Sequence, residues 1–330
     1  MPVTDPTEAR FPGVAAKAGH YESWYLKACH PSEPLGAWIR YTVHKRPEAS
    51  PTGSLWFTLF DAAADGPRAS KVTLPAPAAG GGDWVRVGEA SLGPGRASGS
   101  APSDRCDASW DLRFDTPEPP LFHLPRDWMY RAPLPRTKLL SPVPAARFEG
   151  SIAVDGRELD VSGWRGMVGH NWGAQHTERW IWMHGLGFDE AGEGSWLDAA
   201  IGRIKIGPVT TPWIGNGALS IDGERIALGG PGRRVKVMER PDGCEFVLPG
   251  KDTHLHGSVE ADPGDFVGWV YADPEGGQHH AVNCSVADMR LRVERDGRPP
   301  LELHVAGGAA YELGMREHDH GMEIQPFPDG

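Results

Sequence analysis

The sequence of 330 residues is poor in cysteine and has no long apolar run. Its four cysteines, Cys29, Cys106, Cys244 and Cys284, lie far apart and form no C-x-x-C pair, which argues against a zinc knuckle or a dense disulfide framework. No segment approaches the ~20 consecutive apolar residues of a membrane-spanning helix, and the N-terminus lacks the basic and apolar regions of a signal peptide. We therefore expect a cytoplasmic protein with reduced thiols and no membrane span.

Positive charge is also scarce, since 33 Lys and Arg residues face 44 Asp and Glu residues and the formal net charge is −11. The basic residues are scattered along the chain, so nucleic acid and anionic membranes are poor partners. The sequence lacks the glycine-rich motifs that bind dinucleotides or nucleotide phosphates, and it lacks the G-x-S-x-G motif of serine hydrolases. We expect no nucleotide cofactor and no serine nucleophile.

The sequence also has little helix-like periodicity. The chain contains 43 glycines and 31 prolines, which disfavour helices, and 13 tryptophans, which suit half-buried strands. Short runs such as "GAWIRYTVHKR", "RWIWMHGLGF" and "LELHVAG" alternate apolar and polar residues, as strands do. Asp-Gly pairs at residues 155, 222 and 296 predict tight hairpins, because both residues tolerate positive φ. The sequence predicts an all-β protein with antiparallel strands.

An approximate internal repeat divides the chain. "YESWYLKA" (21–28) matches "TERWIWMH" (177–184), which aligns Glu22 and Trp24 with Glu178 and Trp180. Toward the end of each half, an Asp-Gly pair and a later glycine, Gly173 in the first half, match at equal spacing. We predict two tandem lipocalin-like antiparallel β-barrels, residues 1–176 and 177–330, because closed barrels remove exposed sheet edges. A pair of β-sandwiches would give nearly the same pattern.

A proline-rich segment, residues 116–144, interrupts the strand pattern. It also contains large apolar side chains, among them Phe122, Trp128 and Tyr130. A lid or strap across a barrel opening would explain that mixture, and a surface crossover between strands would explain it equally well.

The stretch around residues 170–186 is the main candidate site. If residues 176–186 form one strand, the side chains of every second residue share a face, which presents His176, Glu178, Trp180, Trp182 and His184. Such a polar and aromatic wall suits a cavity that binds a ligand. We expect this cavity where the barrels meet, lined by Trp172, Trp180, Trp182 and part of segment 116–144, with Trp24, Trp128 and Tyr130 as further binding residues.

Proton transfer in this cavity would need an acid and a base. Glu178 lies between aromatic residues, where desolvation would raise its carboxyl pKa and make it a proton donor, with His170 or His176 as partner base. Glu22 and Glu178 are equally well explained as structural residues, because the repeat keeps both. His170 and Asn171 have no counterpart, since the second half has Tyr311 and Glu312 there, and this asymmetry favours a functional role.

The sequence "GMVGHNWG", followed by a tryptophan-rich strand, resembles the D-H-N-W-G motif of carotenoid 1,2-hydratase (hydroxyneurosporene synthase) and the wider AttH-like group. The resemblance implies a two-domain lipocalin-like fold, shared with tocopherol cyclase relatives and fungal Diels–Alderases. It marks His170, Asn171, Trp172 and Gly173 as site residues. Gly169 stands where the motif has its acidic residue, so the proton donor expected for adding water across a polyene double bond is missing from its usual place.

Three histidine pairs are the only further candidates for a metal site: His254-x-His256, His318-x-His320 and His279-His280. No cysteine or carboxylate follows at a third ligand spacing, so we expect no metal.

We therefore predict an enzyme that needs no cofactor and acts on a lipophilic small molecule of isoprenoid or polyketide type, by cyclisation, isomerisation, or hydration or dehydration. The alternative is a carrier without catalytic activity that binds the same kind of molecule. A carrier needs only the aromatic wall, whereas an enzyme also needs an acid or base aimed at the ligand. A monomer or a homodimer fits either function.

Overall fold

The computed structural model describes residues 7–329, and nearly all of its regular structure is β-strand. The helices in this range are three short 3-10 turns: η1 (Phe11–Gly13), η2 (Asp127–Tyr130) and η3 (Pro263–Asp265). None of them is long and apolar enough to cross a membrane. The all-β prediction is confirmed.

The N-terminal sheet has 13 antiparallel strands in the order β4-β3-β2-β1-β13-β11-β9-β8-β7-β6-β5, with β10 and β12 beside β11. Their bounds are β1 (His20–Cys29), β2 (Leu35–Lys45), β3 (Thr52–Asp61), β4 (Arg68–Pro75), β5 (Ala78–Gly80), β6 (Asp83–Val87), β7 (Ala90–Gly93), β8 (Arg96–Pro102), β9 (Asp107–Asp115), β10 (Leu121–Phe122), β11 (Thr137–Val154), β12 (Arg157–Asp160) and β13 (Trp164–Gly173).

The C-terminal sheet has 10 strands in the order β19-β18-β15-β14-β25-β24-β22-β21-β20, with β23 beside β24, and β16 pairs with β17 in a separate hairpin. Their bounds are β14 (Arg179–Leu186), β15 (Trp196–Arg203), β16 (Lys205–Ile206), β17 (Val209–Thr210), β18 (Ile214–Ile221), β19 (Glu224–Gly229), β20 (Lys236–Arg240), β21 (Gly243–Pro249), β22 (Thr253–Glu260), β23 (Val267–Ala272), β24 (Gln278–Arg295) and β25 (Leu301–Met315).

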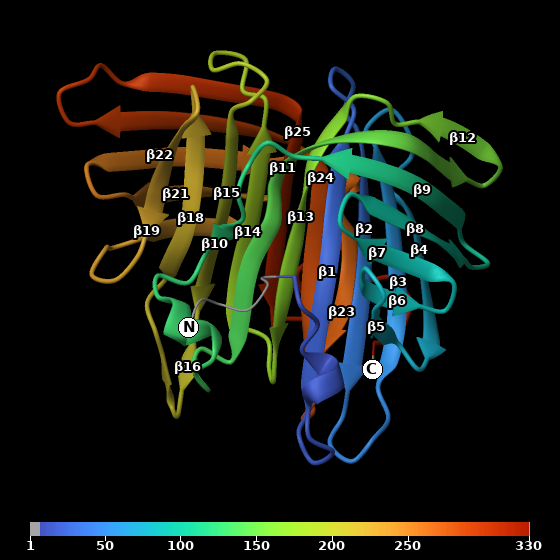
Figure 1. The fold of residues 1–330 in the computed structure, drawn as a ribbon. Helices are drawn as coiled ribbons and strands as arrows, with labels where there is room; N and C mark the ends of the chain where they lie inside the picture. Colours follow the sequence, from blue (N-terminus) through green and yellow to red (C-terminus); the bar gives the residue numbers. More distant parts are fainter. Residues whose placement is uncertain (1–6, 330) are drawn as a thin grey trace.

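Each sheet curls into a half-barrel, and the two half-barrels lie next to each other (Figure 1). All strands through β13 belong to the first sheet and the strands from β14 on belong to the second or to the small hairpin, so the chain changes sheet between Gly173 and Arg179. Two Asp-Gly pairs form the predicted two-residue hairpin turns, with positive φ at Asp155 and Asp222. These curled antiparallel sheets confirm the predicted tandem lipocalin-like fold, with half-barrels in place of closed barrels.

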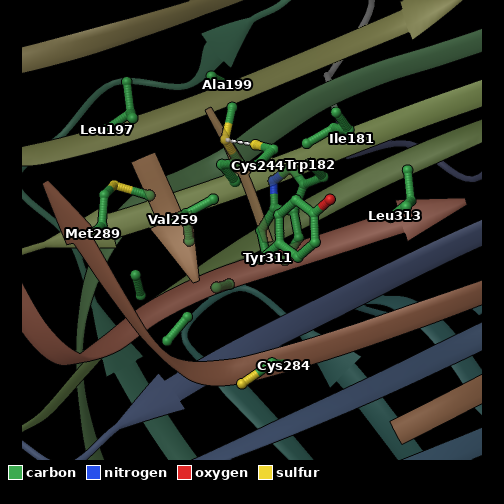
Figure 2. Close-up of a cluster of buried hydrophobic side chains, with 14 of the residues drawn as sticks. Ile181, Trp182, Leu197, Ala199, Cys244, Val259, Cys284, Met289, Tyr311 and Leu313 are labelled. Atoms are coloured by element: carbon green, nitrogen blue, oxygen red, sulfur yellow. Dashed lines mark hydrogen bonds between the residues drawn. The ribbon is translucent and has the colours of Figure 1, made fainter. Parts of the chain in front are cut away.

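Aromatic side chains join the two halves. The indole of Trp56 on β3 meets Trp269 on β23 edge to face, with ring centroids 5.1 Å apart. Tyr25 on β1 meets Trp182 on β14 in the same geometry at 5.3 Å. Figure 2 shows part of the buried cluster to which these rings belong, including Trp182 and Cys244. The core of the C-terminal half therefore continues into the interface, which holds the walls between the halves rigidly.

The sheet register separates the two tryptophans that the repeat aligns. On β1, Trp24 pairs with His170 of β13. The residue aligned with His170 is Tyr311, and Tyr311 pairs with Met183 rather than with Trp180, three residues earlier. Because an odd shift turns a strand residue to the other face, Trp24 lies in the N-terminal core while Trp180 faces the space between the halves. The two tryptophans that the repeat aligns therefore do not occupy equivalent positions in the two halves.

Candidate functional site

A cavity lies between the two half-barrels, where the sequence places it. Strands β1, β2 and β13 form one wall, strands β14, β15, β18, β23 and β25 form the other, and part of segment 116–144 completes it. Its polar lining consists of Tyr21, Tyr25, Arg40, His123, Thr137, Asn171, His176, Thr177, Asn216, Tyr271 and Glu312.

Segment 116–144 crosses from the N-terminal sheet to the C-terminal sheet, as a strap would. Glu118 forms an ion pair with Arg225, with 2.6 Å between Oε2 and Nη2. The ring of His123 lies 3.4 Å from the backbone oxygen of Asn216 on β18. His123 and Leu124 also line the cavity. The segment therefore forms a wall of the cavity and also links the two halves.

Four of the predicted site residues line the cavity: Asn171, His176, Trp180 and Trp182. The strand that presents the tryptophans begins at Arg179 instead of at 176, because residues 174–178 connect the two sheets. His176 still reaches the cavity from this connection, where its ring stacks on Tyr21 with centroids 3.9 Å apart.

Five predicted binding residues do not line the cavity. The Trp24 ring stacks on His170 inside the N-terminal core, and Trp128 is 59% exposed on the surface. Tyr130 and Trp172 pack together in a small separate cluster. His184 is fully buried, with its Nε2 2.9 Å from the backbone oxygen of Pro144, and burial lowers its pKa to about 4.

His170 is part of a buried polar cluster outside the cavity. Its Nε2 lies 2.9 Å from Oε1 of Glu22, and both side chains are fully buried. The same carboxylate accepts hydrogen bonds from the backbone nitrogens of Arg10 at 2.9 Å and Phe11 at 2.7 Å. Burial acts to raise the pKa of Glu22, but hydrogen bonds from His170 and His20 outweigh it and hold the pKa at about 2. In this position His170 holds the carboxylate that binds the N-terminal segment, and it does not line the cavity.

Glu178 also lies outside the cavity lining. Its carboxylate forms an ion pair with Arg316 at 3.0 Å, and its side chain is 20% exposed. The arginine and the partial exposure favour the charged carboxylate rather than the desolvated proton donor that the sequence predicts. Glu22 and Glu178 thus both have the contacts of structural residues.

His176 has the geometry of a general base. Its Nδ1 lies 2.9 Å from Oδ1 of Asp273, and its backbone nitrogen donates to the same oxygen at 2.8 Å. An Nδ1–H that donates to the carboxylate leaves a lone pair on Nε2, and this atom is buried and has no hydrogen-bond partner within residues 7–329. Burial acts to raise the pKa of Asp273, but hydrogen bonds from His176 hold it below its usual value. The pair can therefore accept a proton and stabilise the resulting charge.

Glu312 on β25 is an acidic residue that lines the cavity. It accepts hydrogen bonds from the indole of Trp180 at 2.8 Å, the hydroxyl of Tyr271 at 3.1 Å and the amide of Asn283 at 3.3 Å. Its sequence counterpart, Asn171, lines the same cavity. The repeat aligns Glu312 with Asn171, but the sequence predicts a functional role for Asn171 only.

Tyr25 explains the glycine at position 169. A Cβ atom on Gly169 would lie 2.2 Å from Cζ and 2.4 Å from the hydroxyl oxygen of Tyr25. The Tyr25 ring thus fills the space that a side chain at position 169 would need, and it faces the cavity. The sequence does not predict Tyr25 or its cross-strand neighbour Arg40 as site residues. The pattern of a single strand does not show which of its faces lines a cavity formed with distant strands.

One group of residues could hold a metal ion. Donor atoms of His176, Asp273 and His279 all lie within 4.8 Å of one another, a set of ligand types that zinc and iron accept. Nη2 of Arg316 lies 3.7 Å from Oδ2 of Asp273 and competes with a cation for that oxygen. The sequence predicts no metal site, but these three residues are a specific candidate for one. In the sequence His279 is paired only with its neighbour His280.

The remaining predicted histidine pairs lie apart from the cavity. His254 and His256 are exposed on β22. His280 contacts the other pair, since its Nδ1 lies 2.8 Å from Nε2 of His320 and its ring lies 4.2 Å from that of His318.

No protein-family model matches the chain, and no curated protein sequence is similar to it. Several solved structures are similar to it, and three of them match nearly the whole chain. An AttH-like protein from Nitrosomonas europaea has a TM-score of 0.54 and 16% identity, over 95% of this chain and 98% of that one.

The other two neighbours are enzymes. The Diels–Alderase CghA, solved with Sch210972, has a TM-score of 0.54 and 13% identity, over 90% of this chain and 88% of that chain. Kievitone hydratase from Nectria haematococca has a TM-score of 0.57 and 11% identity, over 94% and 93%. At such identities the similarity establishes the fold, which is the tandem lipocalin-like fold of the AttH-like proteins that the motif around His170 implied.

Proposed function

We propose that the protein is an enzyme that binds a lipophilic small molecule between its two half-barrels and rearranges it by proton transfer, in a cyclisation, an isomerisation, or a hydration or dehydration. Such steps move protons and leave the oxidation state of the substrate unchanged. The molecule would be of isoprenoid or polyketide type, because the wall is built largely from aromatic and aliphatic side chains.

The observation that supports this proposal most strongly is the pairing of His176, which lines the cavity, with Asp273. A carrier needs an apolar wall only, whereas an imidazole oriented by a carboxylate is the arrangement of a general base. Stacking on Tyr21 and on Trp180, with centroids 3.9 and 5.8 Å away, fixes the plane of the His176 ring. In the proposed reaction Nε2 of His176 removes a proton from the substrate and returns it at another atom or to water.

The fold neighbours support the same reaction classes, since one is a hydratase and another is a Diels–Alderase. Tyr25 occupies the place where the motif of the AttH-like group has an acidic side chain. Its hydroxyl faces the cavity and is the donor that we assign in place of that acid, because burial raises the pKa of Tyr25 and keeps it protonated.

The test is turnover of lipophilic metabolites by the full chain. Purified protein is incubated with an organic extract, and mass spectrometry searches for a compound that is consumed while another appears with the same mass or with one water more or less. We expect His176→Gln and Asp273→Asn to lower this conversion by about 100-fold or more.

The control is His254→Gln, because His254 is exposed and far from the cavity lining. Full conversion by His176→Gln would show that another group moves the proton. Recovery of a bound, unchanged molecule from a wild-type protein that converts no compound would instead support the carrier function.

A further inference from the structure

Arg40 is the one buried Lys or Arg residue of the described chain that lines the cavity. Its side chain lies on β2, and the residue is only 4% exposed. One of its five N–H donors is used, since Nε donates to the hydroxyl of Ser23 at 2.5 Å. Among residues 7–329, no carboxylate forms an ion pair with Arg40.

The other buried cations have their charges satisfied by protein oxygens. The ammonium of Lys27 donates to the backbone oxygens of His184 and Gly308, at 3.2 and 2.6 Å. Lys45 donates to three backbone oxygens, and Lys138 to two. Lys71 pairs with Asp329 at 2.9 Å. Arg40 therefore differs from them in leaving its terminal donors to the cavity.

The guanidinium of Arg40 is held in place by aromatic rings. It lies 4.1 Å from the ring centroid of Tyr271 and 5.4 Å from that of Trp56. These cation–π contacts and the hydrogen bond to Ser23 fix its direction without neutralising its charge. Since no carboxylate within residues 7–329 pairs directly with this guanidinium, an anion in the cavity that reached its terminal nitrogens would gain from binding there.

The carboxylates in or near the cavity wall are already saturated by other donors. Glu312 accepts from Trp180, Tyr271 and Asn283. Asp198 accepts from Ser141 and from the indole of Trp182. Neither carboxylate forms an ion pair with Arg40, and Asp329, which interacts electrostatically with Arg40, forms its ion pair with Lys71. Direct hydrogen bonds from the terminal nitrogens of Arg40 are therefore left for a ligand.

We propose that Arg40, together with the hydroxyl of Tyr25, binds an anionic oxygen of the substrate, so that the cavity selects lipophilic molecules with a carboxylate, phenolate or enolate group. Tyr25 and Arg40 face each other across the β1–β2 ladder, and both line the cavity. Within residues 7–329 the Tyr25 hydroxyl has no hydrogen-bond partner to compete for its proton. This assignment rests on the cavity of the proposed function but not on its chemistry.

The test compares two fluorescent probes that share one aromatic skeleton. 8-Anilinonaphthalene-1-sulfonate is anionic, and N-phenyl-1-naphthylamine lacks the sulfonate. Energy transfer from Trp180 and Trp182, which line the cavity, reports binding there. We expect the wild-type full chain to bind the anion about ten-fold more tightly than the neutral probe, and Arg40→Met to remove this preference while changing the affinity for the neutral probe by less than about two-fold.

Arg292→Met is the control, because Arg292 is exposed on β24, forms ion pairs with Glu294 and Glu302, and does not line the cavity. It should keep the preference, and Arg40→Lys should keep part of it. Equal affinities of the wild type for the two probes, failure of both probes to bind, or a preference that survives in Arg40→Met would each overturn the assignment.

A second measurement needs no variant. Displacement of the neutral probe from the wild type by 2-naphthoate should be about ten-fold stronger than by 2-acetonaphthone, its neutral analogue. Equal displacement would also overturn the assignment, even if Arg40→Met does not fold. An anion preference without any turnover would contradict the proposed enzyme and leave the anion site intact, so the two proposals can fail separately.

Discussion

The two halves use a buried carboxylate in different ways. In the N-terminal half, Glu22 on β1 pairs with His170 on β13, and both side chains lie away from the cavity lining. In the C-terminal half, Glu312 on β25 accepts from Trp180 on β14, and both line the cavity. The pairing strands hold corresponding places in the two sheets, but the polar pairs lie on opposite faces. Strands in corresponding places therefore carry a structural carboxylate, Glu22, in one half and a cavity-lining carboxylate, Glu312, in the other.

The partners of each carboxylate explain this difference. Glu22 accepts from the backbone nitrogens of Arg10 and Phe11, so its charge fixes the segment that precedes the first strand. Glu312 accepts only from side chains, and two of these, Trp180 and Tyr271, are cavity residues. A change at Glu22 should therefore act on folding, and a change at Glu312 on the ligand.

The largest effect that we expect is the loss of stability in Glu22→Gln. The amide keeps the shape but loses the charge, and its NH2 group faces backbone donors, so the free energy of unfolding should fall by about 3 kcal/mol. Denaturation in urea measures this change. Glu312→Gln is the matched control and should cost about half as much, because its donors are side chains that can rearrange. Equal losses of unfolding free energy in the two variants would show that Glu22 and Glu312 have the same structural role.

A pH titration sharpens the same comparison. The pKa of Glu22 falls from 4.5 to about 2 on folding, so its stabilising effect is complete above pH 4.5 and is lost as the pH falls through about 2. The wild type should thus lose its advantage over Glu22→Gln in this range, by about 3 kcal/mol. Unfolding free energies at several pH values between 7 and 2 measure it. A difference that stays constant with pH would contradict the low pKa.

The alternation of apolar and polar residues was enough to predict the strands, and the resemblance of the segment around His170 was enough to predict the fold. The motif did not predict which of its residues face a ligand. His170 and Asn171 are neighbours, but they point to opposite faces of β13, and only Asn171 lines the cavity. Facing depends on sheet register, which is set by pairing with distant strands.

The proposed catalytic pair shows the same limit. His176 was predicted, but Asp273 lies 97 positions further along the chain, and the β23 turn region that positions it has no distinctive sequence. Arg40 and Tyr25 are ordinary members of alternating strands in the sequence. Their role depends on the absence of a neighbouring carboxylate, which is a property of three-dimensional packing.

A smaller effect is expected at the glycine of the motif. In Gly169→Ala the new methyl group would overlap the Tyr25 ring, and we expect a loss of about 1–3 kcal/mol in unfolding free energy. Tyr25→Ala should relieve the overlap, so that the double variant is more stable than the two separate losses predict. Gly194→Ala is the control, because no atom lies within 4 Å of its added Cβ. Strict additivity would show that Tyr25 does not fill the space beside position 169.

The smallest effect separates the two tryptophans that the repeat aligns. Trp24 is fully buried, and within residues 7–329 its indole nitrogen has no hydrogen-bond partner, so Trp24→Phe should lower the unfolding free energy by about 2 kcal/mol through lost packing. Trp180→Phe removes a donor to Glu312 at the edge of the cavity and should cost only about 1 kcal/mol.

Binding of N-phenyl-1-naphthylamine distinguishes these two variants more clearly than stability does. Trp180 lines the cavity, so Trp180→Phe should weaken binding of this probe several-fold and reduce the energy transfer to it. Trp24 lies in the core of the N-terminal half, on the face of β1 opposite to the cavity residues Tyr21 and Tyr25, so Trp24→Phe should leave the affinity unchanged. If both variants weakened binding equally, the two tryptophans would be equivalent after all, and the difference in register between the halves would have no consequence for the ligand.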